Sequence, residues 1–74
     1  MTYAERLRAL REDSDFTQAQ IAQLLNIGQR TYCDYEKGKI RIPVDSLILL
    51  AKLYNVSMDY ICAVSDIKKE FPSR

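Results

Sequence analysis

Residues 26–41, NIGQRTYCDYEKGKIR, carry the side chains with the clearest capacity for recognition chemistry. Read as a helix from about Gln29, this stretch divides its side chains between two faces. The outward face holds Gln29, Arg30, Cys33, Asp34 and Lys37, and the inward face holds Tyr32, Tyr35 and Glu36. Inward tyrosines are typical of a core. The outward amide, guanidinium and carboxylate groups together donate and accept hydrogen bonds, which indicates recognition, with an ordinary solvated face as the alternative.

Glu36 is the inward residue that needs a partner. It lies one turn from Tyr32 and beside Tyr35, so its carboxylate points at least partly inward. A carboxylate in that position needs a cation. Arg11 is the best candidate, because it follows Leu7 by four residues and borders the inner face of the first helix. From spacing alone, a Glu36 that turns out to solvent is an equal alternative.

Periodicity and capping signals around this stretch predict five short helices joined by short turns. Thr17 and Gln20 have the spacing of a capping box, which marks the start of the second helix. Asn26, Gly38 and Asn55 are residue types that end helices in a left-handed conformation. The predicted helices cover about residues 2–13, 18–25, 29–37, 43–54 and 58–63.

The length and composition indicate a single small domain. The chain has 74 residues, of which 47% are hydrophobic, with two glycines and two prolines. This is enough for one core and too little for a large cleft. We expect the domain to cover residues 1–64. Residues 65–74 form a polar C-terminal tail in which Ile67 and Phe71 are the large apolar residues.

Composition also argues against several functional classes. The chain lacks histidine, and Cys33 and Cys62 have no paired spacing, so we expect no metal site, no cofactor and no disulfide framework. It shows no catalytic constellation, so we expect no enzyme activity. No segment reads as membrane-spanning or as a signal peptide, and we expect a cytoplasmic protein. The net charge of +1 requires any polyanionic partner to bind a local patch.

Residues 2–64 resemble the Cro/repressor-type helix-turn-helix family, also called XRE-like. The resemblance rests on FTQAQIAQLLNIGQRTYCDYEKGK followed by IPVDSLILLAKLYNVSMDYI. Ala22 matches the small residue where the two helices cross, Asn26 matches the turn, and YEKGK matches the signature that closes the recognition helix. The resemblance implies an all-α fold, a compact five-helix lambda-repressor-like DNA-binding domain.

What the resemblance implies for function is sequence-specific binding of double-stranded DNA by a transcriptional regulator, most simply a repressor. The helix at about 29–37 would enter the major groove, where amide, guanidinium and carboxylate groups match base edges. The implied base-reading residues are Gln29, Arg30, Cys33 and Asp34. The implied phosphate contacts are Gln18, Thr31, Lys37, Lys39 and Arg41.

The resemblance carries structural expectations as well. It favours the Arg11–Glu36 ion pair, and it implies a homodimer on a palindromic operator. The implied dimer interface is Tyr60, Ile61 and Val64. Tyr32 stands where the family usually has Ile or Val, so its hydroxyl could reach the surface. Ala63 stands where glycine is often found, so the fifth helix could run further.

Other readings of the same residues stay open. The bundle could be a protein-interaction module, such as a toxin-neutralising antitoxin or a co-regulator, that binds a protein partner through the Tyr54–Cys62 surface and the tail. Cys33 could be a redox-sensitive contact, or a free thiol with no special role. Cys62 fits either a small buried hydrophobe or an interface residue.

Overall fold

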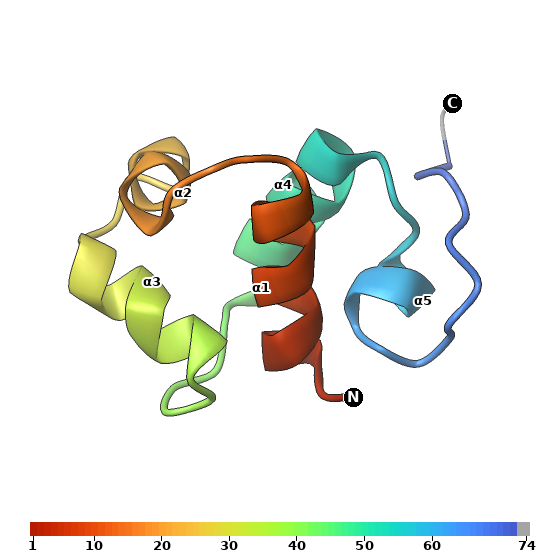
Figure 1. The fold of residues 1–74 in the computed structure, drawn as a ribbon, viewed down its shortest axis with the longest axis horizontal. Helices are drawn as coiled ribbons and strands as arrows, with labels where there is room; N and C mark the ends of the chain where they lie inside the picture. Colours follow the sequence, from red (N-terminus) through yellow and green to blue (C-terminus); the bar gives the residue numbers. More distant parts are fainter. Residues whose placement is uncertain (73–74) are drawn as a thin grey trace.

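A computed structural model describes residues 1–72, and within that range the chain folds into five helices (Figure 1). These are α1 (Tyr3–Asp13), α2 (Gln18–Leu24), α3 (Gln29–Glu36), α4 (Val44–Tyr54) and α5 (Met58–Ile61). In Figure 1, α1 and α4 occupy the middle of the molecule, α2 and α3 lie on one side, and α5 lies on the other. The predicted all-α, five-helix architecture is confirmed.

Side-chain caps fix where three of the helices begin. The Thr2 and Thr17 side chains each accept a hydrogen bond from the backbone amide three residues later. The side-chain oxygens of Glu5 and Gln20 in turn accept from the backbone amides of Thr2 and Thr17. These two capping boxes satisfy backbone donors that a helix cannot satisfy internally. Ser57 caps α5 through a bond from the Tyr60 backbone. The predicted cap at Thr17 is therefore confirmed.

All five helices of the described range end in the same left-handed pattern. After each helix, one residue adopts a positive φ and the chain reverses through a pair of short backbone hydrogen bonds. After α3, for example, Gly38 has φ 73, and the Lys39 amide donates to the Asp34 carbonyl at 2.9 Å. The left-handed residues are Asp15, Asn26, Gly38, Asn55 and Ala63.

The end of α5 corrects an expectation. The absence of glycine at position 63 suggested a longer helix, but α5 ends at Ile61. Ala63 itself adopts φ 62, and the Val64 amide donates to the Asp59 carbonyl at 2.9 Å. These bonds stop the helix despite the cost of about 1–2 kcal/mol for a left-handed residue with a Cβ.

The core lies where the five helices meet, and it contains both inward tyrosines of α3. The Tyr32 ring is fully buried and packs edge-on against Tyr35, with 6.3 Å between ring centroids. The suggestion that the Tyr32 hydroxyl reaches the surface is therefore wrong. The other buried core residues are Leu7, Leu10, Ile21, Ala22, Leu47, Leu50, Ala51, Val56 and Ile61.

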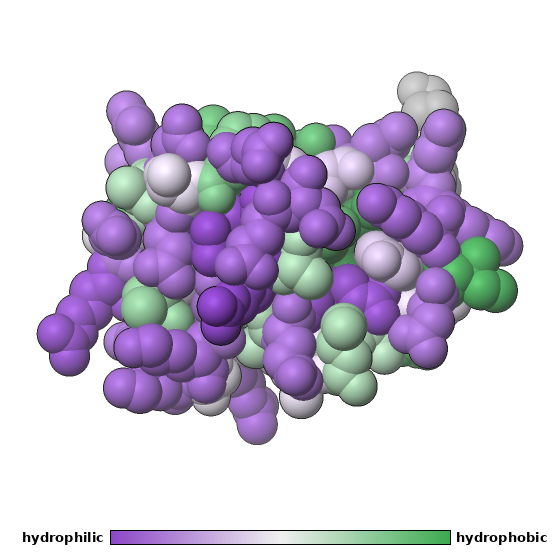
Figure 2. All heavy atoms as spheres, viewed as in Figure 1, coloured by the Kyte–Doolittle hydropathy of each residue, from purple (hydrophilic) through white to green (hydrophobic). Residues whose placement is uncertain are grey.

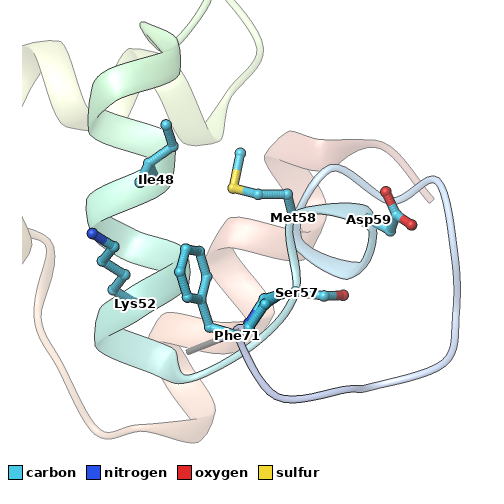
Figure 3. Close-up of a pocket in the computed structure, with 7 residues that line it drawn as sticks. Ile48, Lys52, Ser57, Met58, Asp59 and Phe71 are labelled. Carbon is cyan, nitrogen blue, oxygen red and sulfur yellow. The ribbon is translucent and has the colours of Figure 1, made fainter. Parts of the chain in front are cut away.

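The C-terminal segment packs back onto the helices. The Ser57 amide donates to the Lys69 carbonyl at 2.8 Å, and the Phe71 amide donates to the Asn55 side chain at 3.3 Å. Figure 3 shows the Phe71 ring beside α4, between Lys52 and the start of α5, in a hollow of about 770 Å³. The predicted domain boundary after residue 64 stays a prediction. Ser73 and Arg74, the last residues of the predicted tail, lie outside the described part.

Candidate nucleic-acid interface

Helices α2 and α3 are anchored in the core by small, aliphatic and aromatic side chains. Ile21 and Ala22 of α2 are buried, as are Tyr32 and Tyr35 of α3. Ala22 allows the close approach of the two helices, because its side chain is a single methyl group. The turn between them is closed by Asn26, which has φ 58. The inward face of α3 is thus fixed in the core, and its opposite face is directed outward.

The outward face of α3 forms a concave surface with the start of α2 and the loop after α3. Its hollow has a volume of about 470 Å³. The residues that line it are Gln18, Gln29, Arg30, Cys33, Asp34, Lys37 and Lys39. All four predicted base-reading residues are among them, together with three of the five predicted phosphate contacts. Thr31 and Arg41 do not line this hollow.

The residues of this surface differ in how far they are exposed to solvent. Gln29 and Arg30 at the start of α3, and Lys37 and Lys39 at its end, are exposed, whereas Cys33 and Asp34 are half-buried. Arg41, in the loop beyond, is also exposed. Figure 2 shows a largely hydrophilic surface over α2 and α3 on the face in view. Four cations at the ends of α3 and in the following loop thus create local positive charge in a chain of nearly zero net charge.

The α3 helix is attached to the rest of the domain by a buried polar network around Glu36. The Glu36 side chain is only 3% exposed, and its carboxylate lies 2.7 Å from the Arg11 Nε atom. The Tyr32 hydroxyl donates to Glu36 at 2.5 Å, and the Gln18 amide donates to it at 3.1 Å. Arg11 also donates to the Phe16 carbonyl at 2.9 Å. The predicted Arg11–Glu36 pair is present, and Glu36 does not turn out to solvent.

This network sets the charge states of its members. Burial acts to raise the pKa of Glu36, but the hydrogen bonds from Arg11, Tyr32 and Gln18 outweigh burial and hold the pKa below the usual range of a glutamate. The hydrogen bond to Glu36 raises the pKa of Arg11. Burial, reinforced by the same carboxylate, raises the pKa of the Tyr32 hydroxyl. The ion pair is therefore charged at neutral pH, and Tyr32 keeps its proton.

The sequence did not predict the bonds from Gln18 and Tyr32 to Glu36. Gln18 was assigned to phosphate, but one hydrogen of its side-chain amide is used on Glu36. The sequence suggested that the Tyr32 hydroxyl could reach the surface, yet it donates to Glu36, four positions later on the same helix. The i, i+4 spacing of Tyr32 and Glu36 could have predicted this bond, because residues four apart share a helix face.

The three residues predicted to form the dimer interface differ in their burial within the chain. Ile61 is fully buried in the core of its own chain, so its assignment to an interface between chains is corrected. Tyr60 is half-buried, with the Arg6 guanidinium 3.9 Å from its ring centroid. Val64 is 78% exposed. Tyr60 and Val64 therefore keep surface for a second chain, while Ile61 does not.

In residues 1–72 we find no cluster of three or more histidine, cysteine, aspartate or glutamate side chains arranged to hold a metal ion. None of the helices described is both long enough and apolar enough to span a bilayer.

The family model and the similar proteins all point to the helix-turn-helix family. A model of the helix-turn-helix family matches residues 7–61. The chain is 41% identical over 64 residues to the uncharacterized HTH-type transcriptional regulator YobD of Bacillus subtilis (strain 168), covering 86% of this chain and 57% of that protein. It is 34% identical over 70 residues to the HTH-type transcriptional regulator ImmR of the same organism, covering 95% of this chain and 55% of ImmR.

A phage protein is also similar. The cryptic phage CTXphi transcriptional repressor RstR of Vibrio cholerae is 30% identical over 64 residues, covering 86% of this chain and 58% of RstR. The chain therefore spans a little over half the length of these curated relatives. The similarity covers the helical domain, including both helices that form the concave surface.

Proposed function

The chain belongs to the helix-turn-helix family, and from that premise and the concave α2–α3 surface we propose that it is a sequence-specific DNA-binding transcriptional regulator, most simply a repressor. The observation that carries the proposal is the grouping of Gln29, Arg30 and Asp34 on one outward face, rimmed by exposed lysines. The same face is backed by a fully bonded ion pair, which fixes the orientation of α3.

In this proposal α3 enters the major groove and its outward side chains bind base edges. Gln29 suits an adenine edge and Arg30 suits a guanine edge, because each can form two parallel hydrogen bonds there. Asp34 can accept from a cytosine amino group, and Cys33 lines the same hollow. The exposed positions of Gln29 and Arg30, at the N-terminal end of α3, are those that reach furthest into the groove.

Phosphate contacts would position the helix without reading sequence. Lys37, Lys39 and Arg41 are exposed near one end of α3 and supply positive charge. Gln18 keeps a second amide hydrogen for a phosphate oxygen, since only one is needed for its bond to Glu36. Thr31, which is half-buried, could add a hydroxyl donor at the edge of the surface.

A homodimer would place two such surfaces on a palindromic operator. We propose that Tyr60 and Val64 contribute to the dimer interface, with half-sites about one helical turn apart. The binding of a promoter by such a dimer would exclude the transcription machinery, which is the simplest route to repression.

The test starts with selection of bound duplexes from a random library, followed by affinity measurement on the selected duplex. Arg30→Ala is expected to weaken binding by roughly 5- to 150-fold and to relax the preference at one base pair. Arg8→Ala, which removes an exposed arginine of α1 outside the surface, is the matched control and should bind like the wild type.

Salt dependence provides an independent readout. A dimer that neutralises about 6–10 phosphates should lose roughly 10³- to 10⁵-fold in affinity between 50 and 200 mM salt. Lys37→Ala should weaken binding to all sequences equally and flatten the salt dependence. No enrichment of any duplex in the selection, or an affinity that does not vary with salt, would refute DNA binding through this surface.

A further inference from the structure

A groove lined by leucines lies between α2 and α4, away from the concave surface. Its volume is about 170 Å³, and its lining residues are Leu24, Leu25, Leu49, Leu50 and Leu53. Three of them are substantially open to solvent: Leu24 is 56% exposed, Leu49 is 55% exposed and Leu53 is 41% exposed. In Figure 2, apolar side chains gather along the upper edge of the view, where Figure 1 places α2 and α4.

This groove is not explained by the fold or by DNA binding. Single exposed leucines are common on protein surfaces, but here three exposed leucines join two others around one groove and form a contiguous apolar surface. It shares no residue with the α2–α3 hollow, and it is also separate from Tyr60 and Val64. Because the lining has no polar side chain, its occupant must itself present an apolar surface.

One exposed stripe of α4, called the crest below and formed by Asp45, Leu49 and Lys52, indicates which occupant fits the groove. At 3.6 residues per turn, Asp45, Leu49 and Lys52 fall within an arc of about 60° on the helix surface. All three are exposed, with the anion one turn before the leucine and the cation about one turn after it. Neither Asp45 nor Lys52 forms an ion pair with any residue of the described range. The Lys52 ammonium lies 5.6 Å from the centroid of the Phe71 ring, so its one contact of note is with an aromatic face and not with an anion. The crest therefore carries two opposite charges, neither with an ion-pair partner in the described range, around an apolar centre.

Such a pattern is complementary to itself. When two copies of a helix pack antiparallel about a two-fold axis, a residue before the centre meets the residue equally far beyond the centre on the partner. With the two-fold axis between Ile48 and Leu49, Asp45 of each copy faces Lys52 of the other, so the contact contains two such pairs. The same axis brings the exposed Leu49 of each copy towards the leucine groove of the other.

We propose that the leucine groove and the crest of α4 form a self-association surface, occupied by the same surface of a second copy of this chain in antiparallel orientation. This surface is separate from the α5 surface and does not depend on DNA. A chain that used both surfaces could join two operator-bound dimers, which would make binding at neighbouring operators cooperative.

The first experiment is sedimentation equilibrium of the free protein from 1 to 200 µM. The wild type should form an assembly whose mass is reduced by Leu49→Asp, which places an unpaired carboxylate in the apolar contact. Val44→Asp is the matched control, because Val44 is an exposed apolar residue of the same helix outside the groove. Binding of each variant to a duplex with a single half-site shows whether its DNA-binding surface is intact, so failure of self-association is separable from failure of DNA recognition.

The second experiment tests the antiparallel register by charge exchange. Asp45→Lys and Lys52→Asp should each weaken association, because each places like charges opposite one another, and the double variant should recover the wild-type dissociation constant within about threefold. A wild type that stays monomeric at 200 µM would overturn the proposal, as would an assembly that responds to Val64→Asp but not to Leu49→Asp. Absence of recovery in the double variant would overturn the antiparallel pairing.

Discussion

Glu36 accepts hydrogen bonds from three side chains, on α1, α2 and α3, so its charge affects three elements together. Its carboxylate and the Arg11 guanidinium compensate one another in a largely buried position. Removal of one charge from such a pair is strongly destabilising because the other charge is left buried. The stability of the fold and the orientation of α3 therefore both depend on the protonation state of Glu36.

We expect the contribution of Glu36 to be lost in acid. Because the fold lowers the pKa of Glu36 from its ordinary value, the carboxylate stabilises the fold fully above the unfolded pKa, and this stability is lost as the pH falls through the folded pKa. Glu36→Gln should lower the free energy of unfolding by about 3 kcal/mol at pH 7. Urea unfolding from pH 7 to pH 3 should show the difference from wild type shrinking below about pH 4.5.

The control for this measurement is Glu12→Gln. Glu12 is exposed and lies 3.4 Å from Arg8, so its replacement should change the free energy of unfolding by less than about 1 kcal/mol. If the difference between Glu36→Gln and wild type were constant down to pH 3, the carboxylate would not be the stabilising species.

Two buried tyrosine hydroxyls give an opposite pair of expectations. The Tyr32 hydroxyl donates to a carboxylate, so Tyr32→Phe should lower the free energy of unfolding by about 1.5–3 kcal/mol. The Tyr54 hydroxyl is buried without a partner among the described residues, and burial raises the pKa of Tyr54 to about 12. Tyr54→Phe should therefore be neutral or stabilising by up to about 1 kcal/mol. Paired urea denaturation curves measure both, and equal losses would contradict the assignment.

The ends of the helices show how far local sequence determines this structure. Thr17 with Gln20, and the endings at Asn26, Gly38 and Asn55, were predictable because all their bonds join residues at most five apart. The first helix ends at Asp13, as predicted, but the positive φ values of Asp15 and Ala63 were not predicted, since neither residue type demands one. At Ala63 the surrounding hydrogen bonds override the residue's own preference.

Residues of the candidate site were predicted for a related reason. Side chains on the outward face of one helix have positions fixed by helical periodicity alone, so Gln29, Arg30, Cys33 and Asp34 could be placed together. The burial of Ile61 and the bond from Gln18 to Glu36 depend instead on how separate helices pack, which spacing within one helix does not specify.

At the scale of elements, the two glycines that flank α3 make a matched test. Gly28 caps the helix with no side-chain bond, and Gly38 follows it with φ 73. A Cβ at either position would have no heavy atom within 4 Å, so sterics are equal and only the backbone conformation differs. Gly28→Ser should raise the free energy of unfolding by a few tenths of a kcal/mol through a new cap. Gly38→Ala should lower it by about 1 kcal/mol, because alanine disfavours a positive φ.

Urea midpoints of the two glycine variants check this expectation, with DNA affinity as a second readout, since Gly28 adjoins the outward face of α3. The reverse order of stabilities, or equal effects at the two positions, would contradict the distinction between a capping and a left-handed glycine.

At the scale of the whole molecule, α1 links the two sides. Arg11 points from α1 to Glu36 of α3, whereas Arg6, which is only 4% exposed, points to the α5 side. Arg6 donates to the Tyr60 carbonyl at 2.9 Å and to the Ser65 carbonyl at 3.4 Å, and it lies against the Tyr60 ring. These partners are 54 and 59 residues away in sequence, which explains why sequence patterns did not reveal them.

We therefore expect Arg6 to hold the C-terminal segment in place. Arg6→Ala should lower the free energy of unfolding by about 3 kcal/mol, because it leaves the Tyr60 carbonyl without its buried donor and removes the stacked guanidinium. Arg8→Ala, two residues later on the exposed face of α1, should change the free energy of unfolding by less than about 1 kcal/mol. Asp66→Asn should also have a small effect, since the Asp66 carboxylate is 94% exposed even though it lies 2.9 Å from Arg6.

Hydrogen exchange distinguishes this anchoring role from a general loss of stability. The Ser57 amide is protected by the Lys69 carbonyl, and the Phe71 amide is protected by the Asn55 side chain. In Arg6→Ala both amides should exchange faster by a larger factor than amides of α2 and α3, because the segment after α5 opens without global unfolding. Uniform acceleration across all five helices would mean that Arg6 stabilises the core as a whole, and that the C-terminal segment is held by its own contacts with α4 and α5.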